Sequence, residues 1–89
     1  MSVAVTGFDW DDGNVEHIAW HHFLPEEVEE VFESHCQIRR ARRGRYIALG
    51  ESLDGRLAFV VFERRRGRIR VVTARDMNAK ERRLYRREV

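Results

Sequence analysis

Evenly spaced glycine turns in the second half of the chain constrain the fold more than any other feature. The turn signals are Arg43-Gly44, Asp54-Gly55 and Arg66-Gly67, separated by roughly one strand plus one turn. The expected strands are residues 36–40, which give the weakest signal, 46–50, 57–62 and 69–73. Strands connected in this way form an antiparallel meander of about four strands.

Two of these strands carry a face pattern. Residues 57–62 are apolar on both faces, so we expect a central strand that is covered on both sides. The residues Ile69, Val71 and Thr73 alternate with Arg68, Arg70 and Val72, which predicts one buried face and one wetter, basic face.

Helix signals flank the predicted sheet. Residues 1–10 suit a short strand or an extended entry, and Asp11 or Asp12 is placed to cap a helix over about residues 13–22. Pro25 suits the first turn of a second helix, whose buried stripe is Val28, Val31 and Phe32. A last helix begins near Asn78, which forms a capping-box-like pair with Glu81. We therefore predict an α+β fold, with 89 residues forming one domain.

Charge is strongly segregated along the chain. Residues 1–38 hold nine acids and no Lys or Arg, while residues 39–89 hold 17 basic residues and six acids. Sixteen of the basic residues are arginine, whose planar fork meets phosphate oxygens in pairs. The second part therefore suits a nucleic-acid surface. A solvated basic face, or a bias in the base composition of the genome, would give the same counts.

Other features narrow the class of protein. The longest apolar run, residues 57–62, is far shorter than the roughly 20 residues of a membrane span. The start lacks the pattern of a signal peptide, and the single Cys36 has no partner for an internal disulfide. We expect a soluble cytoplasmic protein that does not contact a membrane. We also expect neither a cofactor nor a bound metal.

Three stretches of the sequence carry a family resemblance. FDWDDGNVEHIAWHHFLPEEVEEVF, GRYIALGESLDGRLAFVVFE and GRIRVVTARDMNAKERRLYRR resemble the BrnT-type toxins, which are RelE-like ribonucleases of type II toxin–antitoxin pairs. The resemblance runs from Phe8 to Arg87. The chain departs from the family pattern at His22, where glycine is usual, and at Phe23-Leu24, where a smaller pair is usual.

The resemblance implies an activity and a partner. A member of this family would be an endoribonuclease that cleaves RNA without a metal and so inhibits translation. A ribbon-helix-helix-like antitoxin, encoded by an adjacent gene, would hold it inactive, and their complex would repress its own promoter. A homodimer or a toxin–antitoxin heterotetramer is then a possible assembly.

Metal-free RNA cleavage needs a base for the 2′-hydroxyl proton, an acid for the leaving 5′-oxygen and a cation for the phosphorane. Arg75, between a strand and a helix, is our candidate for the cation. Arg70, in the preceding strand, is the candidate for a second cation at the same phosphate. The alternative for Arg75 is a local ion pair with Asp76 or Glu81.

Histidine and tyrosine supply the other candidates. His17 and His21 are four residues apart and would share one helix face as acid or base. Surface or packing roles, and a two-ligand metal site without a third ligand, are the alternatives. Tyr85 is a candidate acid or phosphate ligand, or else a core aromatic.

The remaining predictions concern surfaces. The expected RNA-binding residues are Arg45, Arg68, Arg82, Arg83 and Arg86. Trp10, Trp20 and Tyr46 would stack on bases or lie in the core, and we expect Trp10 to be buried. The acidic face of the second helix would repel RNA or meet a second subunit or a basic antitoxin segment. A non-catalytic nucleic-acid-binding module and a pure protein-interaction partner remain the alternative functions.

Overall fold

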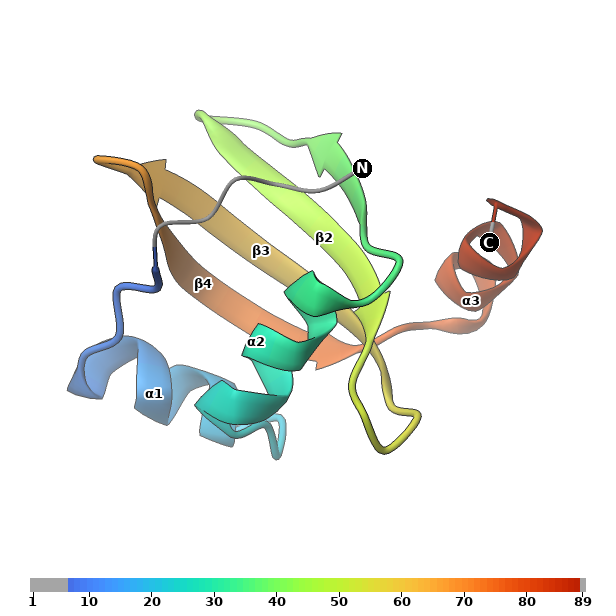
Figure 1. Ribbon diagram of the computed structural model, residues 1–89, viewed down its shortest axis with the longest axis horizontal. Helices are drawn as coiled ribbons and strands as arrows, with labels where there is room; N and C mark the ends of the chain where they lie inside the picture. Colours follow the sequence, from blue (N-terminus) through green and yellow to red (C-terminus); the bar gives the residue numbers. More distant parts are fainter. Residues whose placement is uncertain (1–6, 89) are drawn as a thin grey trace.

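A four-stranded antiparallel sheet in the order β1-β2-β3-β4 forms the centre of the fold (Figure 1). The computed structural model describes residues 7–88. The strands are β1 (Gln37–Arg40), β2 (Arg45–Glu51), β3 (Leu57–Arg65) and β4 (Arg68–Asp76). The helices are α1 (Asp12–Ala19), α2 (Pro25–Glu33) and α3 (Ala79–Glu88). The predicted α+β fold and meander are confirmed, and β3 is a central strand.

The N-terminal segment differs from the prediction. Phe8 forms an isolated parallel bridge with Ile69 rather than a strand. Residues 1–6 of the predicted segment lie outside the described residues. Trp10 is half-buried rather than buried, and its Nε1 donates to Oε2 of Glu29 at 2.8 Å.

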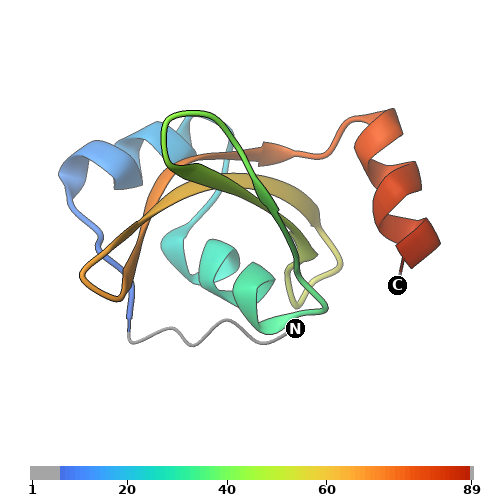
Figure 2. The same ribbon diagram turned by 90° about the horizontal axis from the view of Figure 1, so that it is seen from above.

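The core lies between one face of the sheet and the helices α1 and α2. Figure 2 shows α2 lying under the curved sheet, while α3 stands apart at one end. Val28 and Val31 of α2 are fully buried and Phe32 packs beside them, as the apolar stripe predicted. On the other face, a smaller cluster joins Leu49 and Tyr85 to Met77 under α3.

A bulge divides β4 into two halves. Phe62 pairs with Val71 and Val61 pairs with Thr73, so Val72 is an extra residue. Side chains alternate along a strand, and an extra residue exchanges the faces beyond it. Ala74 therefore enters the core in place of the predicted Thr73, which is half-buried.

The first helix is shorter than predicted and begins with a cap. Asp11 accepts from the backbone N–H of Asn14 and donates its own N–H to the Asn14 side chain, forming a capping box. The helix ends at Ala19 rather than at His22, which adopts a left-handed φ of 62°.

Arg56, in the β2–β3 turn, fixes this helix end. Its guanidinium donates to the carbonyls of His21 and His22 and to Asp76, and its Cζ lies 3.5 Å from the ring centroid of buried Phe23. The chain is therefore turned out of the helix by a tertiary contact that helical spacing does not encode.

Candidate functional site

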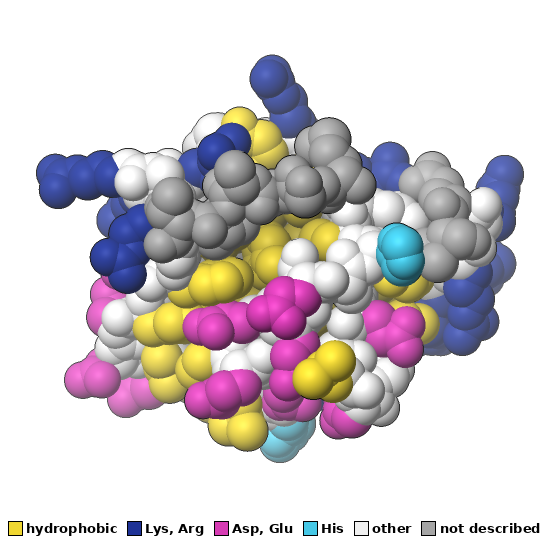
Figure 3. Space-filling view, viewed as in Figure 1, with side chains coloured by type: hydrophobic (Ala, Val, Ile, Leu, Met, Phe, Trp, Pro, Cys, Tyr) yellow, Lys and Arg dark blue, Asp and Glu magenta, His cyan; other side chains and the backbone are white. Residues whose placement is uncertain are grey.

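Charge is segregated in space as it is in sequence. Figure 3 shows acidic side chains gathered over the face formed by the first two helices, with Lys and Arg side chains at the margins. The basic margins correspond to the hairpins and α3, which carry the arginines of residues 39–89.

A polar hollow of about 300 Å³ lies where α1 meets the sheet. Its walls come from α1 and from strands β2, β3 and β4. The residues that line it are Gly13, Asn14, His17, Arg45, Glu63, Arg65, Arg70, Val71 and Val72. Three residues predicted as site residues, His17, Arg45 and Arg70, are thus brought together from separate parts of the sequence.

Strand register aligns the charged groups of this hollow. Arg45 pairs with Glu63, and Glu63 pairs with Arg70, so the three side chains lie in one row across the sheet. The Glu63 carboxylate is 3.5 Å from Nε of Arg45 and 3.4 Å from Nη2 of Arg65. The Arg45 and Arg65 side chains remain 42% and 59% exposed, which leaves their guanidinium groups accessible to a phosphate.

Arg70 is held more firmly than the other cations. Its Nη1 lies 2.9 Å from a carboxylate oxygen of Asp11 and 3.6 Å from one of Asp9. The hydrogen bond to Arg70 lowers the pKa of Asp11, and the same contact raises the pKa of Arg70. Arg70 therefore stays charged and joins β4 to the start of α1.

Asn14 fixes the position of α1 against the sheet. This residue is buried, and its Nδ2 donates to the carbonyls of Asp9 at 2.9 Å and Val71 at 3.1 Å. His17 lies one helical turn further on, is exposed, and lines the hollow. The Asn14 bonds thus set where the His17 imidazole stands relative to Arg70.

Arg75 lies outside this hollow in an ion pair. Its two Nη atoms donate to the two carboxylate oxygens of Glu81 at 2.8 and 3.0 Å, and its Cζ lies 3.9 Å from the Phe59 ring centroid. This is the local ion pair that the sequence offered as the alternative. Whether Arg75 also contacts RNA stays a prediction.

His21 lies in the turn that follows the end of α1 at Ala19. Its carbonyl accepts from Arg56, its side chain is exposed, and it does not line the hollow. Among residues 7–88, no three His, Cys, Asp or Glu side chains are grouped as metal ligands would be.

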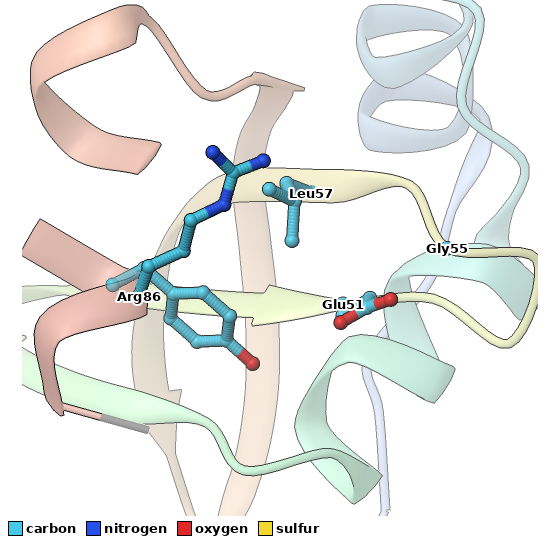
Figure 4. Close-up of a pocket in the computed structure, with 5 residues that line it drawn as sticks. Glu51, Gly55, Leu57 and Arg86 are labelled. Atoms are coloured by element: carbon cyan, nitrogen blue, oxygen red, sulfur yellow. The ribbon is translucent and has the colours of Figure 1, made fainter. Parts of the chain in front are cut away.

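Tyr85 and Arg86 belong to a different pocket under α3. Figure 4 shows the Arg86 side chain reaching toward Leu57, with the Glu51 carboxylate on another wall of this pocket of about 330 Å³. Tyr85 is 4% exposed, and burial raises the pKa of its phenol. The structure thus supports its reading as a core aromatic.

The other predicted RNA-binding arginines are dispersed. Arg68 is exposed at the start of β4, where its Nη2 donates to the carbonyl of Phe8 at 2.8 Å. Arg82 donates to the carbonyl of Met77, and Arg83 is exposed on α3. The arginines of α3 therefore form a surface separate from the hollow.

Glu63, Arg65 and Asn14 are site residues that the sequence did not reveal. Glu63 follows an apolar run, and Arg65 belongs to the cluster before Gly67 that is typical of a solvated turn. The only available signal was the hairpin register: counting back from the Arg66-Gly67 turn pairs Glu63 with Arg70. Asn14 carried a signal as part of the cap but gave none for the sheet contacts.

The fold and this hollow define a class: small α+β proteins with an antiparallel meander, two helices on one face and an arginine-lined site at the sheet. Residues 10–81 match the family model described as ribonuclease toxin, BrnT, of type II toxin–antitoxin system. The chain belongs to this family. No curated protein matches the sequence.

The fold also matches a solved structure. The crystal structure of the Brucella abortus ribonuclease toxin BrnT superposes with a TM-score of 0.68 at 21% sequence identity. The match covers 81% of this chain and 96% of the Brucella chain. At this identity the likeness shows a shared fold. In the described part of the chain, no helix is both long enough and apolar enough to cross a membrane.

Proposed function

We propose that this protein is a metal-independent endoribonuclease toxin that cleaves RNA, inhibits translation and is neutralised by a cognate antitoxin. The observation that carries the proposal is the hollow that brings His17, Glu63 and three arginines together. Membership of the BrnT family supports the class of activity. A ribbon-helix-helix-like antitoxin from an adjacent gene is the partner that the family resemblance favours.

The reaction uses the 2′-hydroxyl of the RNA as its nucleophile. The 2′-oxygen bonds to phosphorus and the bond from phosphorus to the 5′-oxygen breaks, giving a 2′,3′-cyclic phosphate and a 5′-hydroxyl. Glu63 takes the 2′-hydroxyl proton, and the His17 imidazole, in its protonated form, gives a proton to the leaving 5′-oxygen. Arg45 and Arg65 hold the phosphate oxygens, where charge grows in the transition state.

Arg70 has a positioning role in this scheme because Asp11 and Asp9 occupy its nearest face. Its fixed charge adds to the positive field of the hollow. Arg75, His21 and Tyr85 lie outside the hollow, and their catalytic roles stay separate predictions. The α3 arginines remain candidates for binding the flanking RNA strand.

Cleavage of a labelled RNA in the presence of EDTA tests the proposal. His17→Ala and Glu63→Gln should each lower the rate by about 10²–10⁴-fold, because each removes a proton-transfer group. His35→Ala, which alters an exposed histidine outside the hollow, is the matched control and should cleave normally. A single 2′-deoxy nucleotide at the cleaved position should stop the reaction.

Failure has two distinguishable forms. Salt-sensitive RNA binding without any product would favour a non-catalytic nucleic-acid-binding module. Absence of both binding and cleavage would favour a protein-interaction partner. In cells, expression should arrest growth, and co-expression of the product of the adjacent gene should restore it.

A further inference from the structure

An apolar groove with an acidic rim lies at the other end of β2 from the hollow. Its volume is about 360 Å³, and its apolar lining residues are Leu53 and Tyr85, of which Tyr85 is almost fully buried. Leu53 is 84% exposed, which is unusual for a large apolar side chain. Arg45 begins β2 and Glu51 ends it, so the groove and the hollow are roughly 20 Å apart along the strand.

The rim of the groove carries three carboxylates and the exposed His35. Glu30, Glu33 and Glu51 line the groove. Glu30 accepts from the backbone N–H of Leu53, which fixes the loop that presents the leucine. Within residues 7–88, neither Glu33 nor Glu51 forms an ion pair, and both are exposed. In a chain with 17 basic residues, unpaired carboxylates around one groove make a surface complementary to a cation.

We propose that this groove docks a basic, amphipathic segment of a partner protein. An apolar side chain of the segment packs on Leu53, while its Arg or Lys side chains meet Glu33 and Glu51. RNA is disfavoured as the occupant because its phosphates would face these carboxylates. As a docking site for an antitoxin, the groove rests on the function proposed above.

The location has a consequence for neutralisation. A segment seated in the groove leaves the His17 hollow open, because the two sites are at opposite ends of β2. Docking at the groove therefore provides affinity, and a separate contact of the same partner must cover the hollow to stop cleavage. Binding and inhibition should be separable by mutation.

Fluorescence anisotropy with a synthetic labelled peptide tests the docking site. The probe is a helix-forming peptide with two leucines one turn apart and arginines beside them; a glutamate version of the same peptide is the negative probe. Glu33→Gln combined with Glu51→Gln should weaken binding of the basic peptide at least about 10-fold. Leu53→Ser should weaken it as well. Glu16→Gln combined with Glu26→Gln removes the same charge outside the groove and should leave the affinity unchanged.

Three results would overturn the proposal. The first is equal binding of the basic peptide by the groove variants and the control variant. The second is absence of peptide binding by the wild-type protein. The third is sedimentation that shows a second copy of this chain covering the groove. If the groove variants lose peptide binding and still cleave RNA at the normal rate, the proposal is supported. If the wild-type protein cleaves no RNA, the proposed function fails, while the peptide result still decides the docking site.

Discussion

Arg75 and Glu81 join the end of β4 to the first turn of α3 through two parallel hydrogen bonds of 2.8 and 3.0 Å. Glu81 also accepts from the backbone N–H of Asn78, so one carboxylate both caps the helix and fixes it to the sheet. The pair uses one N–H of each Nη atom of Arg75, and Nη1 also donates to the carbonyl of Asp76 at 3.1 Å. An RNA phosphate that binds Arg75 would therefore share the guanidinium with Glu81 or compete with it.

Glu81→Gln should destabilise the protein by about 1–2 kcal/mol, because it weakens a charged hydrogen bond at a side chain that is 16% exposed. Urea denaturation measures the change. Arg83→Ala, at an exposed position of the same helix, should change stability by less than about 0.5 kcal/mol. Equal stability of Glu81→Gln and the wild type would show that the pair does not hold α3.

The catalytic prediction for Arg75 has its own test. If Arg75 binds the scissile phosphate, Arg75→Ala should remain folded and lose cleavage, while Glu81→Gln should free the guanidinium and increase RNA affinity. Gel shifts and cleavage rates measure both. Unchanged cleavage by a folded Arg75→Ala protein would leave this residue with a structural role alone.

Acidification should destabilise the fold in a defined pH range. Arg75 lowers the pKa of Glu81 below its ordinary value of 4.5, and Arg70 lowers the pKa of Asp11 below 3.8. A carboxylate with a lowered pKa in the folded state contributes stability above the unfolded value, and this is lost as the pH falls through the folded value. The urea midpoint should therefore change little from pH 7 to 5 and fall below about 4.5. Glu81→Gln should show a shallower fall, and parallel curves would contradict the assignment.

Arg56→Lys should destabilise the protein despite keeping the charge. Lysine cannot reproduce the fork that bonds two carbonyls and Asp76 at once, nor the stacking on Phe23. We expect a loss of about 1–3 kcal/mol in chemical denaturation. Arg83→Lys, where the arginine is exposed, supplies the comparison and should be neutral.

His22→Gly should stabilise the protein by about 1 kcal/mol. A residue with a side chain is strained at a φ of 62°, and glycine adopts this conformation freely. His22→Ala should not give this gain, because alanine retains the Cβ. Thermal unfolding of the three proteins decides the point, and equal melting temperatures for the glycine and alanine variants would argue against backbone strain.

The parts of the fold that local chemistry determines could be predicted from the sequence. Turn glycines placed the hairpins, and Asn78 with Glu81 marked the start of the last helix, as their mutual hydrogen bonds confirm. The end of α1 could not be predicted, because Arg56 fixes it from 34 residues away. His22, where the family usually has glycine, was the one local sign of a left-handed residue.

The candidate site was predictable only in part. Histidine and arginine chemistry selected His17, Arg45 and Arg70, but nothing in sequence order linked them. Glu63 was missed because its role depends on which residues face it across two strand pairs. The hairpin turns specify that register, because the bulge in β4 lies beyond the pair of Glu63 and Arg70.

Because of the extra residue at Val72, β4 cannot gain or lose a residue without changing which of its side chains face the core. Arg70 and Arg75 are five positions apart, an odd number that would place them on opposite faces of a regular strand. Because of the bulge, both lie on the face away from the core, Arg70 beside Glu63 and Arg75 beside Phe59. Deleting Val72 would turn Arg75 toward the core and Ala74 toward solvent. Changes in chain length can therefore be accommodated at the hairpin tips. An insertion or deletion between these two arginines would disrupt both the core and the basic surface.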